Sequence, residues 1–159
     1  MKEWIMNADR IAIEELIYQT CTALDQNDYS EFLGLCNEHF EYKVSAFSPE
    51  IKKDMTWLDH DRAEIEELFN TLPKHNSDRA PLTRNAVVYR VDFDSGKKQA
   101  NVVTALQIFK TNLNGGATQV FAVGKYYDTV SLDGQGPTLV KRHVKLDTRD
   151  LGWGYHVPF

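Results

Sequence analysis

The sequence predicts an α+β fold in which one long, curved and mostly antiparallel sheet wraps around amphipathic helices as a cone. The last third of the chain contains two long strand-like runs, 118–130 and 138–147, which are joined by a glycine-rich turn at 133–137. Two more strand-like segments, 86–93 and 100–109, precede them. Because the helical segments come before these strands, the order along the chain is helices first and sheet after.

Length and composition indicate one globular domain spanning residues 1–159. The chain has 159 residues, of which 42% are hydrophobic and 26% charged, and these are ordinary values for a protein that buries a core. The net charge of −5 argues against nucleic acid as a partner. The sequence has no run of the roughly 20 apolar residues that a membrane span needs, and its first residues do not resemble a signal peptide. We therefore expect a cytoplasmic protein.

Two helices and a strand are expected at the start of the chain. Asp9 is expected to cap a first helix, which should end in the polar segment 25–28. Its buried face carries apolar or small residues three or four apart, namely Ile13, Leu16, Ile17, Thr20 and Leu24. The aromatic-rich segment 29–36 predicts a short second helix, and the alternation in 40–44 predicts a strand.

The middle of the chain predicts a connector and a third helix. Residues 48–57 show no clear period and are expected to be a connector. Asp61 and Glu64 have the spacing of a capping box and should begin a helix, which Pro73 should end. The expected order of elements is therefore ααβαββββ.

Metal chemistry has little support in the residue spacings. Cys21 and Cys36 fall in helical segments, have no second ligand two residues away, and are expected to be buried, reduced thiols. His60 lies between Asp59 and Asp61 in the one tight histidine–carboxylate group of the sequence. A helix N-terminus explains that group more simply, because aspartate favours the positive end of the helix dipole.

General acid–base catalysis is the enzyme alternative. In a cone-shaped pocket, Asp25 at the end of the first helix could face a histidine on the sheet, either His143 or His60. Strand alternation places His143 on the polar face together with Leu139, Lys141 and Lys145, opposite Val140, Val144 and Leu146. His143 is therefore expected to lie outside the apolar pocket.

The C-terminal segment 150–159 is unusually aromatic. Alternating positions carry large apolar side chains, namely Trp153, Tyr155, Val157 and Phe159. A loose tail of this composition would expose too much apolar surface. We expect it to pack across its own domain or into a neighbouring subunit.

Several strings resemble the NTF2-like superfamily and, within it, the small (β) subunits of Rieske non-haem iron ring-hydroxylating oxygenases. The strings that carry this resemblance span nearly the whole chain and are 23–25, 57–62, 81–84, 124–128 and 141–147. Two more segments, 48–57 and 146–152, resemble a sulfonate-oxidising member of that family.

The resemblance implies a non-catalytic β subunit that stabilises and assembles an α3β3 hydroxylase. This chain would hold no cofactor. The large (α) subunit would carry the Rieske [2Fe–2S] cluster and the mononuclear iron, and a ferredoxin and a reductase would act on the complex. The small subunits would form a homotrimer. Many relatives have histidine after the arginine that corresponds to Arg84, and Asn85 stands there in this chain, which makes an acid–base role harder to build.

Interface roles are therefore expected before catalytic ones. The candidate interface residues are Trp57, Asp59, Asp61, Arg62, Arg84, Arg142, Arg149, Trp153, Tyr155 and Phe159. The alternatives are a stand-alone dehydratase or isomerase that uses Asp25 with His60 or His143, and a binding domain without chemistry. If Asp25 and one of these histidines meet in one closed pocket, the enzyme is favoured over the β subunit and the binding domain.

Overall fold

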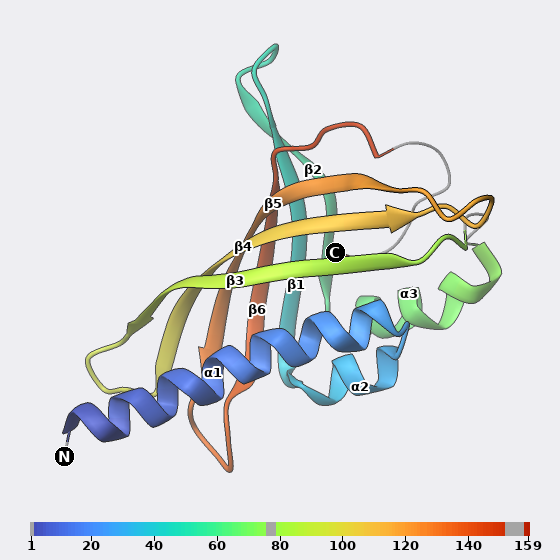
Figure 1. Cartoon of the computed structure of the whole chain (residues 1–159). Helices are drawn as coiled ribbons and strands as arrows, with labels where there is room; N and C mark the ends of the chain where they lie inside the picture. Colours follow the sequence, from blue (N-terminus) through green and yellow to red (C-terminus); the bar gives the residue numbers. More distant parts are fainter. Residues whose placement is uncertain (1, 76–78, 152–157) are drawn as a thin grey trace.

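The fold was analysed in a computed structural model, which describes residues 2–75, 79–151 and 158–159. The elements in chain order are α1 (Lys2–Asp25), α2 (Tyr29–Gly34), β1 (Cys36–Ser48), β2 (Lys53–Asp61), α3 (Arg62–His75), β3 (Leu82–Phe93), β4 (Gln99–Thr111), β5 (Thr118–Ser131) and β6 (Thr138–Leu146). Figure 1 shows a strongly curved sheet with the helices gathered on one of its faces. The predicted α+β cone is confirmed.

The strands form one six-stranded sheet in the order β2-β1-β6-β5-β4-β3. The strands from β3 to β6 make an antiparallel meander, and β1 and β2 form a hairpin. The two parts are joined by the parallel pairing of β1 with β6. That pairing places β1 beside the last strand and makes one curved, open sheet, whose edge strands are β2 and β3.

The first helix begins earlier than its sequence signal. α1 starts at Lys2, so Asp9 lies inside the helix and is not its cap. The helix ends at Asp25 as predicted, and Asn27 follows in the left-handed region with φ 54°. Asp28 then caps α2, because its carboxylate accepts a hydrogen bond from the backbone N–H of Glu31 at 3.0 Å.

The expected connector at 48–57 is wrong, because most of it belongs to the β1–β2 hairpin. β2 runs from Lys53 to Asp61 at the edge of the sheet, and none of its residues is fully buried. An exposed edge strand does not need the apolar alternation that reveals a strand in a sequence. The order is therefore ααββαββββ, and the hairpin projects beyond the rest of the sheet (Figure 1).

The predicted capping box of α3 is present. The backbone N–H of Glu64 donates to Asp61 Oδ1 at 2.9 Å, and the backbone N–H of Asp61 donates to Glu64 Oε1 at 3.2 Å. Pro73 does not end the helix, which continues to His75. Because Pro73 lies in the last turn, its missing N–H removes only one hydrogen bond near the C-terminal end of the helix.

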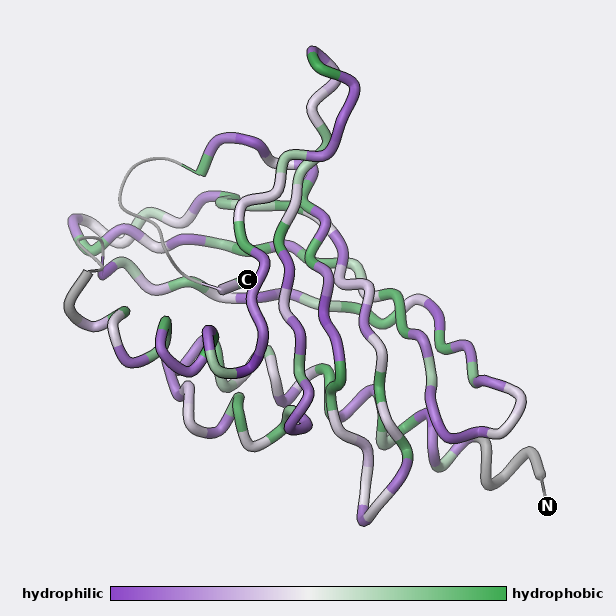
Figure 2. Tube along the Cα trace, turned by 180° about the vertical axis from the view of Figure 1, so that it is seen from behind, coloured by the Kyte–Doolittle hydropathy of each residue, from purple (hydrophilic) through white to green (hydrophobic). Residues whose placement is uncertain are grey.

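Cys36 is the first residue of β1 and not part of a helix. Like Cys21, it is a free, buried cysteine, which confirms the expectation of buried, reduced thiols. Hydrophilic and hydrophobic stretches alternate along the strands (Figure 2), and the apolar side of the sheet meets the buried stripe of α1. No helix of the described residues is long and apolar enough to span a bilayer.

Candidate functional site: a buried polar cluster and an uncovered sheet face

A fully buried ion pair lies in the cone. Arg142 on β6 stands directly opposite Asp128 on β5, and its Nε and Nη2 donate to the two carboxylate oxygens at 2.9 and 3.0 Å. Nη2 also donates to the hydroxyl of Thr20 on α1 at 3.0 Å. The guanidinium carbon lies 3.8 Å from the centroid of the Tyr126 ring. Both charged side chains are 0% exposed, so the pair links α1 to the sheet from inside.

Burial and charge act against each other at this pair. Burial raises the pKa of the Asp128 carboxyl, and the charge of Arg142 opposes that effect. Burial also works against the charge on Arg142, but the Asp128 carboxylate outweighs it and holds the pKa of the guanidinium above its ordinary value. Arg142 therefore stays charged at neutral pH inside its own domain, contrary to the expectation that it faces a partner. The sequence indicates the buried position of Arg142, because Arg142 lies on the same face of the strand as the apolar Val144 and Leu146.

A second buried arginine holds the candidate base Asp25. The Asp25 carboxylate accepts hydrogen bonds from the backbone N–H of Arg84 at 3.0 Å and from its Nη1 at 2.8 Å. The Arg84 side chain is 1% exposed, so it too is directed into its own domain and not toward a partner. Asp25 thus fastens the end of α1 to β3. The neighbouring Asn85 lies on the other face of β3, where it is exposed and donates to Gln107.

His143 lies on the outer face of β6, away from the cone. Its neighbours Arg142 and Val144 are both buried, so alternation directs His143 outward, as predicted. Its Nε2 is 2.7 Å from the hydroxyl oxygen of Ser45 on β1. Burial, followed by the charges of nearby lysines, lowers the pKa of His143, and the two largest lysine effects come from Lys145 and Lys43.

The predicted set of residues around His143 is wrong at one position. Leu139 is 0% exposed and faces the core, whereas Lys141 is exposed. The register shifts by one residue on β6 between the pairs Thr129–Lys141 and Val130–Leu139. This bulge reverses the alternation, so that Leu139 and His143 lie on opposite faces.

The three candidate catalytic residues are engaged separately. His60 Nδ1 on the edge strand β2 lies 3.3 Å from Glu64 Oε2, next to the capping box of α3. Within the part of the chain that the structure describes, no hydrogen bond or ion pair joins Asp25 to His60 or to His143. The Asp–His pair that the enzyme alternative requires is therefore not assembled in these residues.

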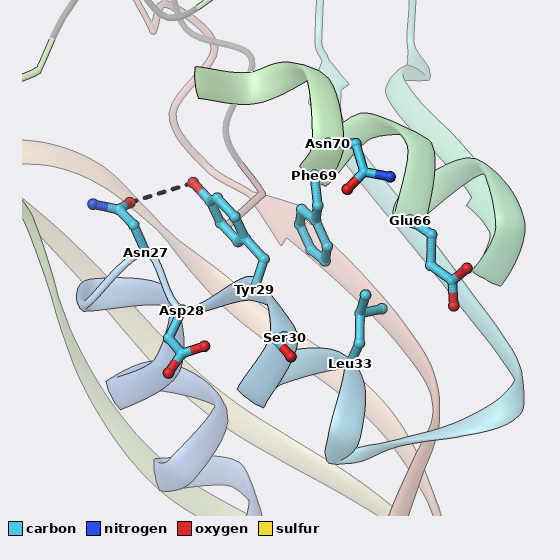
Figure 3. Close-up of a pocket in the computed structure, with 8 residues that line it drawn as sticks. All are labelled: Asn27, Asp28, Tyr29, Ser30, Leu33, Glu66, Phe69 and Asn70. Carbon is cyan, nitrogen blue, oxygen red and sulfur yellow. Dashed lines mark hydrogen bonds between the residues drawn. The ribbon is translucent and has the colours of Figure 1, made fainter. Parts of the chain in front are cut away.

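A shallow depression lies between α2 and α3 on the helical side of the molecule (Figure 3). Its volume is about 500 Å³, and it is lined by Asn27, Asp28, Tyr29, Ser30, Leu33, Glu66, Phe69 and Asn70. The stacked rings of Tyr29 and Phe69, with centroids 4.5 Å apart, form its apolar part. None of the candidate catalytic residues lines it. Among the described residues, no three His, Cys, Asp or Glu side chains come together as metal ligands would.

The remaining interface candidates divide into exposed and internally bonded residues. Trp57, Asp59 and Asp61 are exposed along β2. Arg62 is bonded internally, since its Nη1 donates to the carbonyls of Leu33, Cys36 and Asn37 at 3.0 to 3.2 Å and so fixes the junction of α2 and β1. Arg149 forms an ion pair with Glu50 of the hairpin.

The aromatic tail is described only at its end. Phe159 is 4% exposed, so it packs into the core of its own domain. The expectations for Trp153 and Tyr155 lie outside the described residues.

The sequence interpretation missed an exposed apolar surface on the face of the sheet opposite the helices. Val87 and Tyr89 on β3 are 51% and 64% exposed, and Tyr127 on β5 is 41% exposed. On the β1–β2 hairpin, Phe47 and Ile51 are 55% and 59% exposed. In the described part of the chain no helix covers this face, as Figures 1 and 2 show from opposite sides. Only the topology of the sheet shows which face of these strands is uncovered.

Comparisons with known proteins agree with this architecture. The family described as "Ring hydroxylating beta subunit" matches residues 19–152. The methanesulfonate monooxygenase hydroxylase subunit beta of Methylosulfonomonas methylovora is 38% identical over 154 residues, which cover 92% of this chain and 85% of that protein. The 2-aminobenzenesulfonate 2,3-dioxygenase subunit beta of an Alcaligenes species is 32% identical over 154 residues, covering 94% of this chain and 99% of that protein.

A solved structure supports the fold. The beta subunit of a candidate aromatic-ring-hydroxylating dioxygenase from Novosphingobium aromaticivorans superposes with a TM-score of 0.81 at 19% identity, covering 98% of this chain and 99% of that chain. The fold is thus the NTF2-like cone that the sequence predicts. This chain belongs to the ring hydroxylating beta subunit family. The resemblance found in the sequence, including the likeness to a sulfonate-oxidising member, is confirmed.

Proposed function

We propose that this chain is the non-catalytic β subunit of an oxygenase that acts on a sulfonate. The observation that carries the proposal is its membership of the ring hydroxylating beta subunit family together with its two curated relatives. Both relatives are beta subunits, and both belong to enzymes named for a sulfonate substrate. The substrate itself would bind to the large subunit, so this chain takes part in its oxidation by holding the complex together.

The contacts of the candidate catalytic residues support an assembly role. Asp25 is held by Arg84, His60 contacts Glu64, and His143 contacts Ser45 on the outer face. Each group therefore has a structural partner that accounts for its position. In the complex that we propose, the large (α) subunit carries the Rieske [2Fe–2S] cluster and the mononuclear iron, and a ferredoxin and a reductase supply electrons to it.

The uncovered sheet face supports contact with other subunits. Its exposed valine and tyrosines, and the apolar side chains of the projecting hairpin, form the kind of surface that protein partners cover. We assign this surface to assembly of a homotrimer of this chain within an α3β3 hydroxylase in the cytoplasm. Trp57, Asp59 and Asp61 are exposed on β2, the opposite edge strand from β3, and we propose them as further subunit contacts.

The proposal that the large subunit carries the catalysis and this chain the assembly can be tested by purifying the subunits separately. This chain and its large subunit are purified apart and together, and iron content, cluster absorbance and sulfonate-dependent oxygen uptake with ferredoxin and reductase are measured. We expect iron and cluster to follow the large subunit, and the His143→Gln variant of this chain to leave turnover per assembled complex unchanged. Stoichiometric iron in this chain alone, or turnover by it alone, would overturn the proposal.

A further inference from the structure

The end of the described chain is inserted into the cone. Phe159 is 4% exposed and is hydrogen-bonded to a strand 117 positions away. Its backbone N–H donates to the Tyr42 hydroxyl on β1 at 2.7 Å, and that hydroxyl donates to the Phe159 carbonyl at 3.1 Å. The preceding carbonyl, that of Pro158, accepts a hydrogen bond from Arg84 Nη2 at 2.8 Å. Side chains of the cone thus form hydrogen bonds to the backbone of this segment, as they would to the polar atoms of a bound ligand.

The groups that hold the segment are themselves fixed in place. Arg84 is oriented by the Asp25 carboxylate, which accepts from its Nη1 at 2.8 Å. Tyr42 is 1% exposed, and burial raises the pKa of its phenol, so the hydroxyl keeps its proton and can donate. The Phe159 ring stacks against Phe121 of β5, with 6.2 Å between centroids and 28° between planes. Side chains of β1, β3 and β5 therefore converge on two residues, and Asp25 at the end of α1 orients one of these side chains.

We propose that the cone keeps a binding site for a small aromatic molecule carrying a carbonyl or carboxylate acceptor, and that Pro158–Phe159 occupies this site as a built-in plug. The ring would lie against Phe121, and Arg84 and Tyr42 would donate to the acceptor oxygens. The inference is independent of the proposed assembly role, because it concerns the interior of the cone and not the outer face. It also gives Asp25 and Arg84 a specific role, which is to position the donor that holds the plug.

The site can be tested by removing the ring and offering a replacement. Apolar cavities of about 150 Å³ inside proteins stay dry and bind benzene. In the full chain, Phe159→Ala is titrated with benzene and with 3-phenylpropionate, and the melting temperature is followed. We expect a rise of about 3–6 °C at a tenfold excess over Kd for the variant and none for the unsubstituted chain. Because the backbone of residues 158 and 159 still occupies Tyr42 and Arg84 in Phe159→Ala, the carboxylate is tested in a variant that lacks both residues. There 3-phenylpropionate is expected to stabilise more than benzene does, and this extra gain is expected to disappear when Tyr42→Phe is added.

Two results would overturn the proposal. Equal stabilisation of the unsubstituted chain would mean that the ligand binds elsewhere, and no stabilisation of a folded Phe159→Ala chain would mean that no site is left behind. If Phe159→Ala does not fold, the Tyr42→Phe variant replaces it, with amide hydrogen exchange at Phe159 as the readout. Exchange should be slow in the unsubstituted chain and at least tenfold faster in Tyr42→Phe. An unchanged exchange rate would contradict the plug.

Discussion

The buried charges inside the cone belong to two residues 14 positions apart in the sequence, on adjacent strands. Arg142 and Asp128 have no exposed side-chain surface, and each compensates the burial of the other. Strand alternation could predict that Arg142 points inward, because it shares the phase of Val144 and Leu146. The identity of its partner could not be predicted in the same way, because it depends on the register between β5 and β6.

Breaking this pair from one side should destabilise the protein strongly. Asp128→Asn leaves Arg142 charged, buried and without a counter-ion, and we expect a loss of about 3–5 kcal/mol in the free energy of unfolding. Urea denaturation measures it. The matched control is Asp92→Asn, because Asp92 pairs with Arg90 on the surface, where the loss should be below about 1 kcal/mol. Similar losses in the two variants would contradict the assigned burial.

His143 should make the stability depend on pH. Its pKa in the folded chain lies below the ordinary value of 6.5, so the unfolded chain binds the proton more tightly. The contribution of His143 to the free energy of unfolding is therefore fully present above pH 6.5. It is lost as the pH falls from 6.5 through the lowered pKa of the folded chain. We expect His143→Gln to flatten this slope in denaturation curves measured between pH 7.5 and 5. His39→Gln is the control, since that ring is 80% exposed, and it should leave the slope in place.

Among the elements, the contact between β5 and β6 depends on a glycine. A Cβ on Gly124 would collide with the carbonyl oxygen of Lys145 and would lie 2.9 Å from Leu146 Cα. We expect Gly124→Ala to lower the free energy of unfolding by about 1–3 kcal/mol, because the two strands would have to separate. Gly34→Ala is the control, since no atom lies within 4 Å of its added Cβ, and that change should be nearly neutral. Thermal denaturation of both variants measures the two losses, and equal losses would contradict the close contact at Gly124.

The elements also show where sequence patterns suffice. The α3 cap follows from two residues three apart, and it forms as predicted because its hydrogen bonds are local. β2 could not be predicted, because an exposed edge strand lacks apolar alternation. α1 begins before the expected cap Asp9, because the residues ahead of Asp9 are also compatible with a helix. The bulge next to Leu139 could not be seen, since a one-residue register shift leaves no mark in one strand alone.

At the scale of the whole molecule, the order of helices and strands was enough to predict a cone, because a long curved sheet has to bury one face against the helices that precede it. The insertion of Pro158 and Phe159 into the cone could not be predicted. Their hydrogen bonds join Phe159 to Tyr42, 117 positions away, and Pro158 to Arg84, 74 positions away. Which face of the sheet stays uncovered by helices could also not be predicted, because it depends on the strand order.

The uncovered face should behave as an interface. Replacing Val87 and Tyr89 together by serine removes apolar surface that is exposed in the single chain, so the fold should be retained. We expect association with the other subunits to weaken at least tenfold, which is about 1.4 kcal/mol or more, in dilution experiments followed by analytical ultracentrifugation. Glu67→Ser on the exposed side of α3 is the control and should leave association unchanged. Undiminished assembly of the double variant would place the interface elsewhere.

The measurement that tests the central claim most directly is light scattering coupled to size exclusion. It is made on this chain alone and after co-expression with the large subunit. The account predicts a trimer of the chain alone, or a hexamer with equal numbers of the two subunits when they are expressed together. A monomer or dimer that elutes apart from the large subunit would contradict it.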